Sequence, residues 1–351
     1  MIFRYPIWAV AFLVACSNQG GAAPESTKDD TGSQHGRRET EAPPVASPFG
    51  LARTVDQARY TADVATIAKE RTPNNPQWQS VQDLCATRFE QYGFTVERRH
   101  YATGTNVVGV KTGTSEQDKA HQIIVGAHYD SVANCPGADD NASGVAGTLE
   151  AARVLSSASF PRTLTLTCWD EEETGYKGST ATAKQSTQNH DIIDAVFDFE
   201  MIAFKSDAEN SQTFPVGIEL VAPLQAQWLK ANKNRGNFIA TFGNPGTEHA
   251  LEVFSVYAQK VGVPNLATGL TPLGMLNPLL GDLRRSDHGP YWTEGYPAVM
   301  VTDTANFRNP AYHCLNGTVD DTSRLNFEFA TQVVKSVVAA SAEMLGLPRD
   351  I

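Results

Sequence analysis

Gly126-Ala127-His128-Tyr129-Asp130 directly follows the apolar run 123–125, which has the composition of a buried β-strand. The stretch Gly137-Ala138-Asp139-Asp140-Asn141-Ala142-Ser143-Gly144 comes next and leads into a helical pattern over 143–155. Strands and helices that alternate in this way are typical of an α/β protein, whose sites lie beyond the carboxyl ends of the strands. The sequence thus predicts that these polar side chains lie at a functional site.

The same alternation continues over 51–351 and predicts one large α/β domain. Helical spacing occurs over 51–69, 78–92, 143–155, 224–233, 248–261 and 325–345. Strand patterns occur over 94–96, 106–110, 122–125, 163–169, 195–202 and 298–302. Residues 264–285 are rich in Gly, Pro and Leu and poorly periodic, so we expect a loop over an apolar pocket there.

The N-terminal part of the chain is predicted to target and anchor the protein. Residues 1–15 read as a signal peptide, because Arg4 precedes an apolar run too short to span a bilayer. Leu13-Val14-Ala15-Cys16 resembles the lipobox of bacterial lipoproteins, in which the cysteine is acylated; an ordinary signal peptide with an incidental cysteine is the alternative. Residues 16–50 predict a disordered tether. We therefore expect an extracytoplasmic protein, lipid-anchored at Cys16 to a bacterial membrane, on the periplasmic face of the outer membrane.

The charge pattern argues against one class of partner. The 351 residues carry a formal net charge of −11 and contain no Lys/Arg-rich block, which disfavours binding to nucleic acid. Besides Cys16 the chain has four cysteines, at positions 85, 135, 168 and 314. An even number permits disulfides in an oxidising periplasm without requiring any.

His128 and Asp130 are two residues apart, so in an extended backbone both side chains project from the same side. Asp130 is expected to accept the second N–H of the His128 ring and so to orient it as a metal ligand. Asp139 and Asp140 are two adjacent acids, one more than capping of the following helix requires. Because one carboxylate has two oxygens and can bridge two cations, this stretch predicts a site for two metal ions.

Four consecutive acids, Asp170–Glu173, follow the strand pattern 163–169. Gly175 and Gly178 let the chain turn tightly after them, so neighbouring glutamates can point in different directions. One glutamate would bind metal while the other holds the attacking water and accepts its proton. Imidazole and carboxylate donors without thiolate are typical of a hydrolytic Zn²⁺ pair and not of a structural zinc.

From Ala127 to Val337 the chain resembles the M28 family of zinc peptidases, the aminopeptidase group with two cocatalytic zinc ions. Glu172-Glu173-Thr174-Gly175-Tyr176-Lys177-Gly178-Ser179 is similar to the family's Glu-Glu-x-Gly-x-x-Gly-Ser. The resemblance implies a mixed, mostly parallel β-sheet flanked by helices, the zinc-peptidase fold of the phosphorylase/hydrolase-like type. It implies two Zn²⁺ as cofactors and Glu172 as the general base. The implied metal ligands are His128, Asp140 as the bridge, Glu173, Glu200 and His313.

Two implied roles have alternatives. Glu200, in Phe199-Glu200-Met201-Ile202, stands where the family usually has aspartate, and Asp198 on the same strand face is the rival ligand. Tyr312 matches a family tyrosine whose hydroxyl stabilises the oxyanion, and simple packing is the alternative. His288, in Ser286-Asp287-His288-Gly289-Pro290, is expected to be structural or to line the pocket, because the ligand set closes without it.

The resemblance implies hydrolysis of peptide bonds, and most directly an aminopeptidase that releases N-terminal amino acids from peptides with a free N-terminus. Three alternatives remain: a glutaminyl cyclase with one zinc, a carboxypeptidase in which Arg285 or Arg308 binds the substrate carboxylate, and an inactive lipid-anchored binding module. Cys135 and Cys314 lie beside predicted ligands, and either a disulfide between them or two free thiols fits this position.

Overall fold

The computed structural model describes residues 46–350 apart from Val216. The predicted signal peptide, Cys16 and most of the predicted tether lie outside the described residues. Residues 48–50, which we assigned to the tether, belong to the fold instead, because helix α1 (Pro48–Ala52) begins there. The backbone N–H of Phe49 donates to Asp350 Oδ1 (3.0 Å), a contact between residues 301 positions apart that no local pattern reveals. None of the described helices combines the length and the apolar composition needed to cross a membrane.

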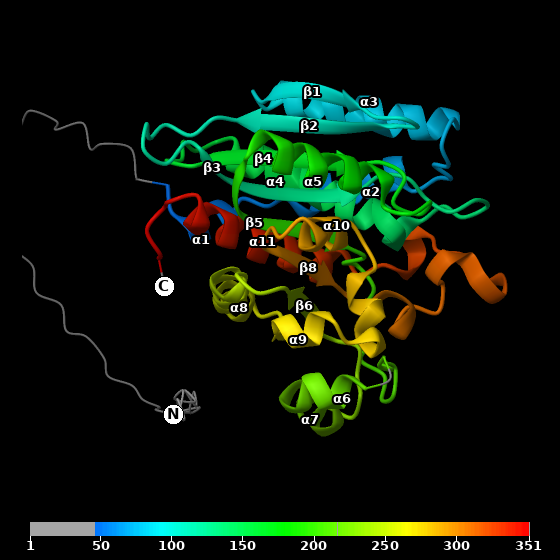
Figure 1. Cartoon of the computed structure of the whole chain (residues 1–351). Coiled ribbons are helices and arrows are strands. Elements are labelled where there is room, and N and C mark those ends of the chain that lie inside the picture. Colours follow the sequence, from blue (N-terminus) through cyan, green and yellow to red (C-terminus); the bar gives the residue numbers. More distant parts are fainter. Residues whose placement is uncertain (1–45, 216, 351) are drawn as a thin grey trace, which may run out of the picture. The chain divides into compact units, whose positions relative to one another are not determined.

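An eight-stranded mixed β-sheet is the central layer, with the strand order β1-β2-β4-β3-β5-β8-β6-β7 (Figure 1). Its strands are β1 (Thr95–His100), β2 (Thr105–Lys111), β3 (His121–His128), β4 (Thr163–Trp169), β5 (Ile192–Glu200), β8 (Ala298–Thr302), β6 (Ile239–Gly243) and β7 (Asn265–Gly269). The pairs β4/β3, β3/β5, β5/β8 and β6/β7 are parallel, and the others are antiparallel. The predicted fold class, a single α/β domain with a mixed, mostly parallel sheet, is confirmed.

Helices cover both faces of this sheet because successive residues of its central strands point to opposite sides. In β3, Ile123 and Val125 join the larger apolar core, whereas Ile124 joins a second core on the other face. The larger core contains α2 (Gln57–Ile67), α3 (Pro76–Gln91), α4 (Gly144–Leu155), α8 (Glu248–Val261) and α11 (Phe327–Met344). The second core contains α5 (Lys177–Asn189), α6 (Ile218–Val221) and α10 (His288–Thr293). The short helix α7 (Pro223–Ala231) contacts β7, and α9 (Pro272–Met275) follows β7 in the chain.

Two element predictions are wrong. The pattern over 51–69 is not one helix but two, α1 and α2, because Asp56 caps a new helix by accepting from the N–H groups of Ala58 and Arg59. Residues 264–285 are not a continuous loop: β7 pairs with β6 along the edge of the sheet, and α9 follows it. A five-residue edge strand that ends in Gly269 takes its stability from the neighbouring strand and is too short to show a period of its own.

The central parallel strands determine where the site lies. In the sheet register, His128 at the end of β3 pairs with Trp169 at the end of β4, and Gly126 pairs with Asp198 of β5. The carboxyl ends of β3, β4 and β5 therefore meet at one edge of the sheet. The segments that follow them carry the predicted acids and lie there side by side, as the general rule for open α/β sheets anticipates.

Candidate active site

Two groups of potential metal-binding side chains meet at this edge. One group is His128, Glu172 and Glu200, and the other is Asp140, Glu173 and His313; within each group the ligand atoms lie within 4.8 Å of one another. The structure thus brings together all five residues predicted to bind metal and the predicted base. They come from the ends of β3 and β5, from the turn after β4, and from two short helical segments far apart in sequence, 138–143 and 312–317.

Asp140 lies between the two histidines. Its Oδ1 is 3.5 Å from Nε2 of His128, and its Oδ2 is 3.2 Å from Nε2 of His313. A glutamate approaches the same nitrogen of each histidine: Glu200 Oε2 is 3.3 Å from His128 Nε2, and Glu173 Oε2 is 3.2 Å from His313 Nε2. The two oxygens of one carboxylate therefore face two separate sets of donors.

These donors fit metal ions better than they fit each other. His128 is fully buried, yet neither of its ring nitrogens makes a hydrogen bond of good geometry, and Oε1 of Glu173 also lacks a partner. Unsatisfied buried polar atoms of this kind are rare unless an ion or water belongs there. Two ligands about 2 Å from a tetrahedral zinc lie about 3.3 Å apart, close to the separations found between these nitrogens and oxygens.

The concentration of acids shifts the protonation of the site. Burial alone lowers the pKa of His128, but Glu172, Asp130, Asp140 and Glu200 outweigh it and raise that pKa well above its usual range. Burial and the charge of Asp140 raise the pKa of Glu173 to about 7. Protons therefore compensate the negative charge when no cation is bound, and bound cations would displace them.

Glu172 lies among the donors and is only partly buried. Loss of hydration raises the pKa of its carboxyl well above the usual range, His128 opposes this rise, and Glu200 adds to it. A carboxyl group with a raised pKa can both accept and return a proton near neutral pH. Its position leaves both roles open to it, base and ligand, and only a measurement of metal content separates them.

Asp130 contacts both His128 and the turn that carries the glutamates. Its Oδ1 is 3.3 Å from His128 Nδ1, in the orienting position expected from the sequence. The same carboxylate also accepts the backbone N–H groups of Glu172 (3.0 Å) and Glu173 (3.2 Å), contacts that the sequence did not predict. One side chain thus sets the position of a histidine and of two glutamates relative to it. Gly175, at φ +109°, completes the tight turn that follows.

Glu200, and not its rival Asp198, faces the donors. Glu200 accepts a hydrogen bond from the hydroxyl of Ser286 (2.6 Å), which orients its carboxylate. Asp198 instead accepts from the backbone N–H of His288 (3.0 Å) and lies 3.1 Å from its Nδ1. His288 is buried and its Nε2 lies 2.9 Å from the carbonyl oxygen of Leu283, so it has a structural position, away from both groups of donors.

The loop of Asp140 is held by side chains that the sequence did not reveal. Asp320 accepts the backbone N–H groups of Asp139 (3.0 Å) and Asp140 (3.0 Å). Arg71, fully buried, donates to the carbonyl oxygens of Tyr129 (2.9 Å) and Gly137 (3.0 Å). These contacts span 58 to 181 residues, and an isolated Arg or Asp carries no local signal of them. Asp139 itself turns away from the site and accepts from Asn309 (2.8 Å).

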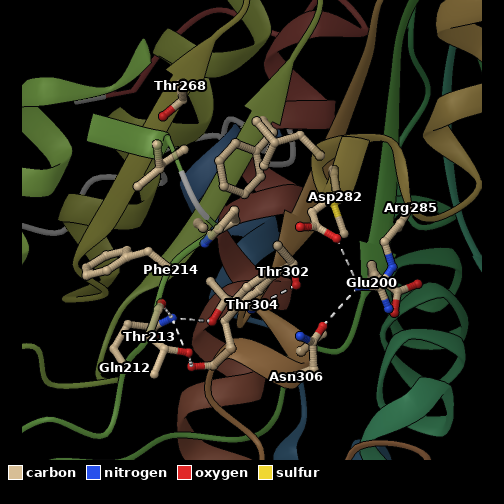
Figure 2. A pocket seen from close by; sticks show the side chains of 18 of the residues that line it. Glu200, Gln212, Thr213, Phe214, Thr268, Asp282, Arg285, Thr302, Thr304 and Asn306 are labelled. Atoms are coloured by element: carbon tan, nitrogen blue, oxygen red, sulfur yellow. Dashed lines mark hydrogen bonds and ion pairs between the residues drawn. The ribbon is translucent and has the colours of Figure 1, made fainter. Parts of the chain in front are cut away.

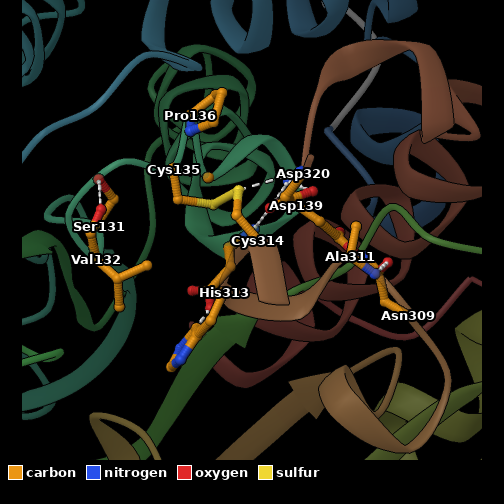
Figure 3. Close-up of a disulfide and its surroundings, with 12 residues drawn as sticks. Ser131, Val132, Cys135, Pro136, Asp139, Asn309, Ala311, His313, Cys314 and Asp320 are labelled. Carbon is orange, nitrogen blue, oxygen red and sulfur yellow. Dashed lines mark hydrogen bonds and ion pairs between the residues drawn. A yellow bond between two sulfur atoms is a disulfide. The ribbon is translucent and has the colours of Figure 1, made fainter. Parts of the chain in front are cut away.

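Cys135 and Cys314 form a disulfide directly beside His313 (Figure 3). This bond joins the loop before Asp140 to the turn that carries His313, and thus two segments that contribute donors to one group. A second disulfide, Cys85–Cys168, joins α3 to β4; we did not predict this pairing. Of the alternatives for Cys135 and Cys314, the structure has the disulfide.

Tyr312 stacks on His313, with ring centroids 3.7 Å apart. Its hydroxyl accepts a hydrogen bond from Arg285 Nη2 (2.7 Å), which leaves the hydroxyl proton free to be donated elsewhere. Both residues line the pocket, whereas Arg308 does not. Arg308 is buried and its Nε donates to Gln212 (2.8 Å), so of the two arginines considered as a carboxylate clamp only Arg285 is in reach of a ligand.

A cavity of about 370 Å³ opens from the donors and extends over β6 and β7 (Figure 2). Glu200, Arg285 and Asp282 lie at one side of it, and Phe214 and Thr268 lie at the other (Figure 2). Segment 264–285 does border the cavity as predicted, through Leu266, Thr268, Asp282, Leu283 and Arg285. The apolar wall also has contributions from other elements, for example Ile218 of α6, Leu229 of α7 and Phe242 of β6.

Comparisons with known proteins agree with this geometry. The model of peptidase family M28 matches residues 106–248. The protein YfbL of Escherichia coli (strain K12), itself uncharacterized, is 34% identical over 228 residues, 62% of this chain and 65% of its own length. A probable zinc metalloprotease of Pyrenophora tritici-repentis (strain Pt-1C-BFP) is 26% identical over 309 residues, 78% of this chain and 62% of its own length. The chain thus spans somewhat less than two thirds of these relatives.

The fold has solved counterparts. An aminopeptidase from Aneurinibacillus sp. strain AM-1 superimposes with a TM-score of 0.63 at 14% identity, over 87% of this chain and 98% of that one. The matched segment 106–248 contains the predicted base and four of the five predicted metal-binding residues, all except His313. Through this segment, with its paired groups of histidines and acids, the chain is similar to peptidase family M28.

Proposed function

We propose that the protein is a peptidase with two Zn²⁺ ions that releases N-terminal amino acids from peptides. The position of Asp140 carries this proposal, because its two oxygens face the imidazoles of His128 and His313 at 3.5 and 3.2 Å. One carboxylate shared in this way suits two ions better than one. The proposed ligands are His128, Asp140 and Glu200 for one ion and Asp140, Glu173 and His313 for the other.

Zinc in such a site supplies a Lewis acid and makes water a better nucleophile near neutral pH. Glu172 lies within 4.8 Å of the donors of the first group and has a raised pKa. We assign to it the acceptance of the proton of the attacking water and its later return to the leaving amine. The hydroxyl of Tyr312, held by Arg285, would donate to the oxygen of the scissile carbonyl as negative charge develops there.

The acids of the cavity support a free amine at the substrate's reacting end. Its donor end is lined by four carboxylates, Asp140, Glu172, Glu173 and Glu200, whose charge two Zn²⁺ ions would balance, so an α-ammonium group would be held by a hydrogen bond to an individual carboxylate and not by net charge. A relative and a solved structure that carry the names of a metalloprotease and an aminopeptidase are consistent with this class of reaction.

The proposal is tested with the zinc-loaded protein and p-nitroanilides of leucine and phenylalanine, each with a free and with an acetylated amino group. We expect cleavage of the free compounds and refusal of the acetylated ones, because acetylation removes the ammonium group that a carboxylate would hold. Equal or faster cleavage of the acetylated compounds contradicts aminopeptidase action. No turnover of any compound by protein that has bound zinc would support the inactive binding module.

One observation favours a second candidate, a carboxypeptidase. Arg285 is the one Lys or Arg among the described residues that line the cavity, and it is in reach of a substrate carboxylate. Its guanidinium already donates to Tyr312 and lies 3.3 Å from Asp282, so a carboxylate would compete with these partners. Release of C-terminal residues from N-acetylated peptides would establish this candidate. A glutaminyl cyclase would instead need one zinc and would release ammonia from N-terminal glutamine.

We further propose that the enzyme is extracytoplasmic and lipid-anchored through Cys16. The two disulfides support an oxidising compartment, since such bonds rarely persist in the cytosol. Replacing Cys16 by Ala should release the enzyme from the membrane fraction while its peptidase activity is kept. A wild-type protein that is soluble with an unmodified N-terminus contradicts this localisation.

A further inference from the structure

One guanidinium lies beside the acids at the donor end of the cavity. Of the described residues that line this cavity, only Arg285 is a lysine or an arginine, and its side chain is 39% exposed. Its Nη1 lies 3.3 Å from Asp282 Oδ1 and 3.2 Å from Asn306 Oδ1 (Figure 2). Its Nη2 donates to the hydroxyl of Tyr312 (2.7 Å), and no described residue accepts a hydrogen bond from its Nε. A ligand in the cavity can therefore still accept hydrogen bonds from this guanidinium.

The charges around Arg285 leave room for an anion. Its partner Asp282 is 40% exposed, and an ion pair between two such side chains is screened by water and contributes little. The four carboxylates near the imidazoles carry as much negative charge as two Zn²⁺ ions carry positive charge, so the loaded site is close to neutral. An anionic group beside Arg285 would thus meet a cation without facing a net negative charge.

The contact with Tyr312 indicates which part of a substrate lies near Arg285. In the proposed mechanism the Tyr312 hydroxyl donates to the oxygen of the scissile carbonyl, and Arg285 holds that hydroxyl from the other side. In a dipeptide, only the amide nitrogen and one Cα separate the scissile carbonyl carbon from the carbon of the terminal carboxylate. The carboxylate of a dipeptide thus comes within reach of the guanidinium, whereas a longer peptide has a neutral amide at the same place.

We infer that Arg285 binds the terminal carboxylate of the leaving residue and that dipeptides with two free ends are the preferred substrates. The inference rests on the proposed aminopeptidase function and adds its substrate class. It differs from the carboxypeptidase candidate because the free amine is required as well. One carboxylate of the site holds the amine and the guanidinium holds the substrate carboxylate, so the two contacts together select the length of the peptide. Longer peptides and p-nitroanilides are cleaved without the second contact and at lower kcat/KM.

The test compares kcat/KM for compounds with the same first residue: Leu-Ala, Leu-Ala amide and Leu-Ala-Ala. The amide lacks the carboxylate, and the tripeptide carries it one residue further away. We expect Leu-Ala to exceed both by about 10–100-fold, the usual contribution of a hydrogen bond to a charged group. In Arg285→Gln this preference should disappear. Arg285→Lys should keep part of it, because a cation without the planar fork remains.

The ratio of Leu-Ala to Leu-Ala amide separates binding of the carboxylate from the support of Tyr312. Loss of that support lowers kcat for both compounds alike, so Tyr312→Phe should keep the wild-type ratio and Arg285→Gln should not. Arg284→Gln is the matched control, because it makes the same change at the neighbouring residue, which is not among the residues that line the cavity. Calorimetry with the Glu172→Gln variant, which is expected to turn over slowly, compares the binding of the two compounds without turnover.

Each outcome has a separate meaning. A wild type that cleaves Leu-Ala amide or Leu-Ala-Ala as fast as Leu-Ala overturns the inference and upholds aminopeptidase action. A dipeptide preference that persists in Arg285→Gln contradicts the assignment to Arg285. Cleavage of N-acetyl-Leu-Ala in preference to Leu-Ala overturns both the inference and the proposed function. Thermal unfolding identifies a variant that does not fold, and the comparison of compounds with the wild type needs no variant.

Discussion

Glu172 and Glu173 are neighbours in the chain, and Asp130 accepts the backbone N–H of each. Glu173 is directed to His313, at 3.2 Å, whereas Glu172 belongs to the group around His128. One carboxylate therefore separates two adjacent glutamates into the two donor groups. This arrangement agrees with the proposed roles, in which Glu173 binds metal and Glu172 moves a proton.

Replacing Glu172 by Gln tests that separation. The amide has nearly the same shape but cannot accept a proton, so we expect kcat to fall by about 10²–10⁴ while zinc content stays the same. Glu171→Gln is the control, because Glu171 contacts Lys177 (2.9 Å) and Thr103 and lies outside both donor groups. Loss of zinc in Glu172→Gln would instead identify Glu172 as a ligand.

Ser286 had no predicted role of its own and appeared only in the motif that contains His288. Its hydroxyl donates to Glu200 (2.6 Å), and partners of this kind typically change metal affinity by about 10–100-fold. Ser286→Ala should weaken zinc binding by that order, measured by competition with a chromophoric chelator. Ser341→Ala, at a buried serine of α11 whose hydroxyl has no hydrogen-bond partner, should leave zinc affinity unchanged. Equal affinity in the two variants would show that Glu200 needs no such support.

At the scale of elements, the site depends on where three strands and two loops end. The ends of β3 and β4 were visible in the sequence, because apolar runs stop where histidine and acids begin, whereas the strand pattern over 195–202 ran two residues past the end of β5 at Glu200. The residues that hold the donors in place were not visible in the sequence, because their contacts are distant. Asp320 contacts Asp140 across 180 positions, and Ser286 contacts Glu200 across 86 positions. Strands β6 and β7 were missed for a similar reason, since five-residue strands are stabilised by pairing and show little periodicity.

The disulfide Cys135–Cys314 connects two of these loops. Removing it with Cys135→Ser and Cys314→Ser together should lower the free energy of unfolding by about 2–4 kcal/mol and weaken zinc binding, because His313 is then held less firmly near Asp140. The matched control removes the other disulfide, Cys85–Cys168, which should affect stability more than zinc affinity. Equal zinc affinities in the wild type and the Cys135/Cys314 variant would contradict a role of this bond in the site.

At the scale of the whole molecule, buried acids make the metal-free protein sensitive to pH. Burial raises the pKa of Asp170 and Asp303 to about 6 and that of Asp320 to about 7. Burial lowers the pKa of His313, but Asp140 and Glu173 outweigh it and raise it to about 10. In each case the folded protein holds a proton that the unfolded chain has released, so stability falls as pH rises from about 4 to 10.

Zinc should therefore stabilise the protein more at high pH than at low pH. We expect the chelator-treated protein to unfold at a higher temperature at pH 5 than at pH 8, and the increase in Tm on adding zinc to be larger at pH 8, where the ligands give up their protons. Differential scanning calorimetry with and without zinc measures both. A metal-free protein that gains stability from pH 5 to pH 8 would contradict these pKa shifts.

The number of zinc ions bound per chain is the most direct test of the proposed two-metal site. Metal-free protein is titrated with zinc. Bound zinc is measured by inductively coupled plasma mass spectrometry, and peptidase activity is measured in the same samples. Two donor groups with Asp140 between their histidines predict two zinc ions per chain at full activity, and Asp140→Asn should weaken the binding of both. Full activity with one zinc ion per chain would contradict the two-metal site.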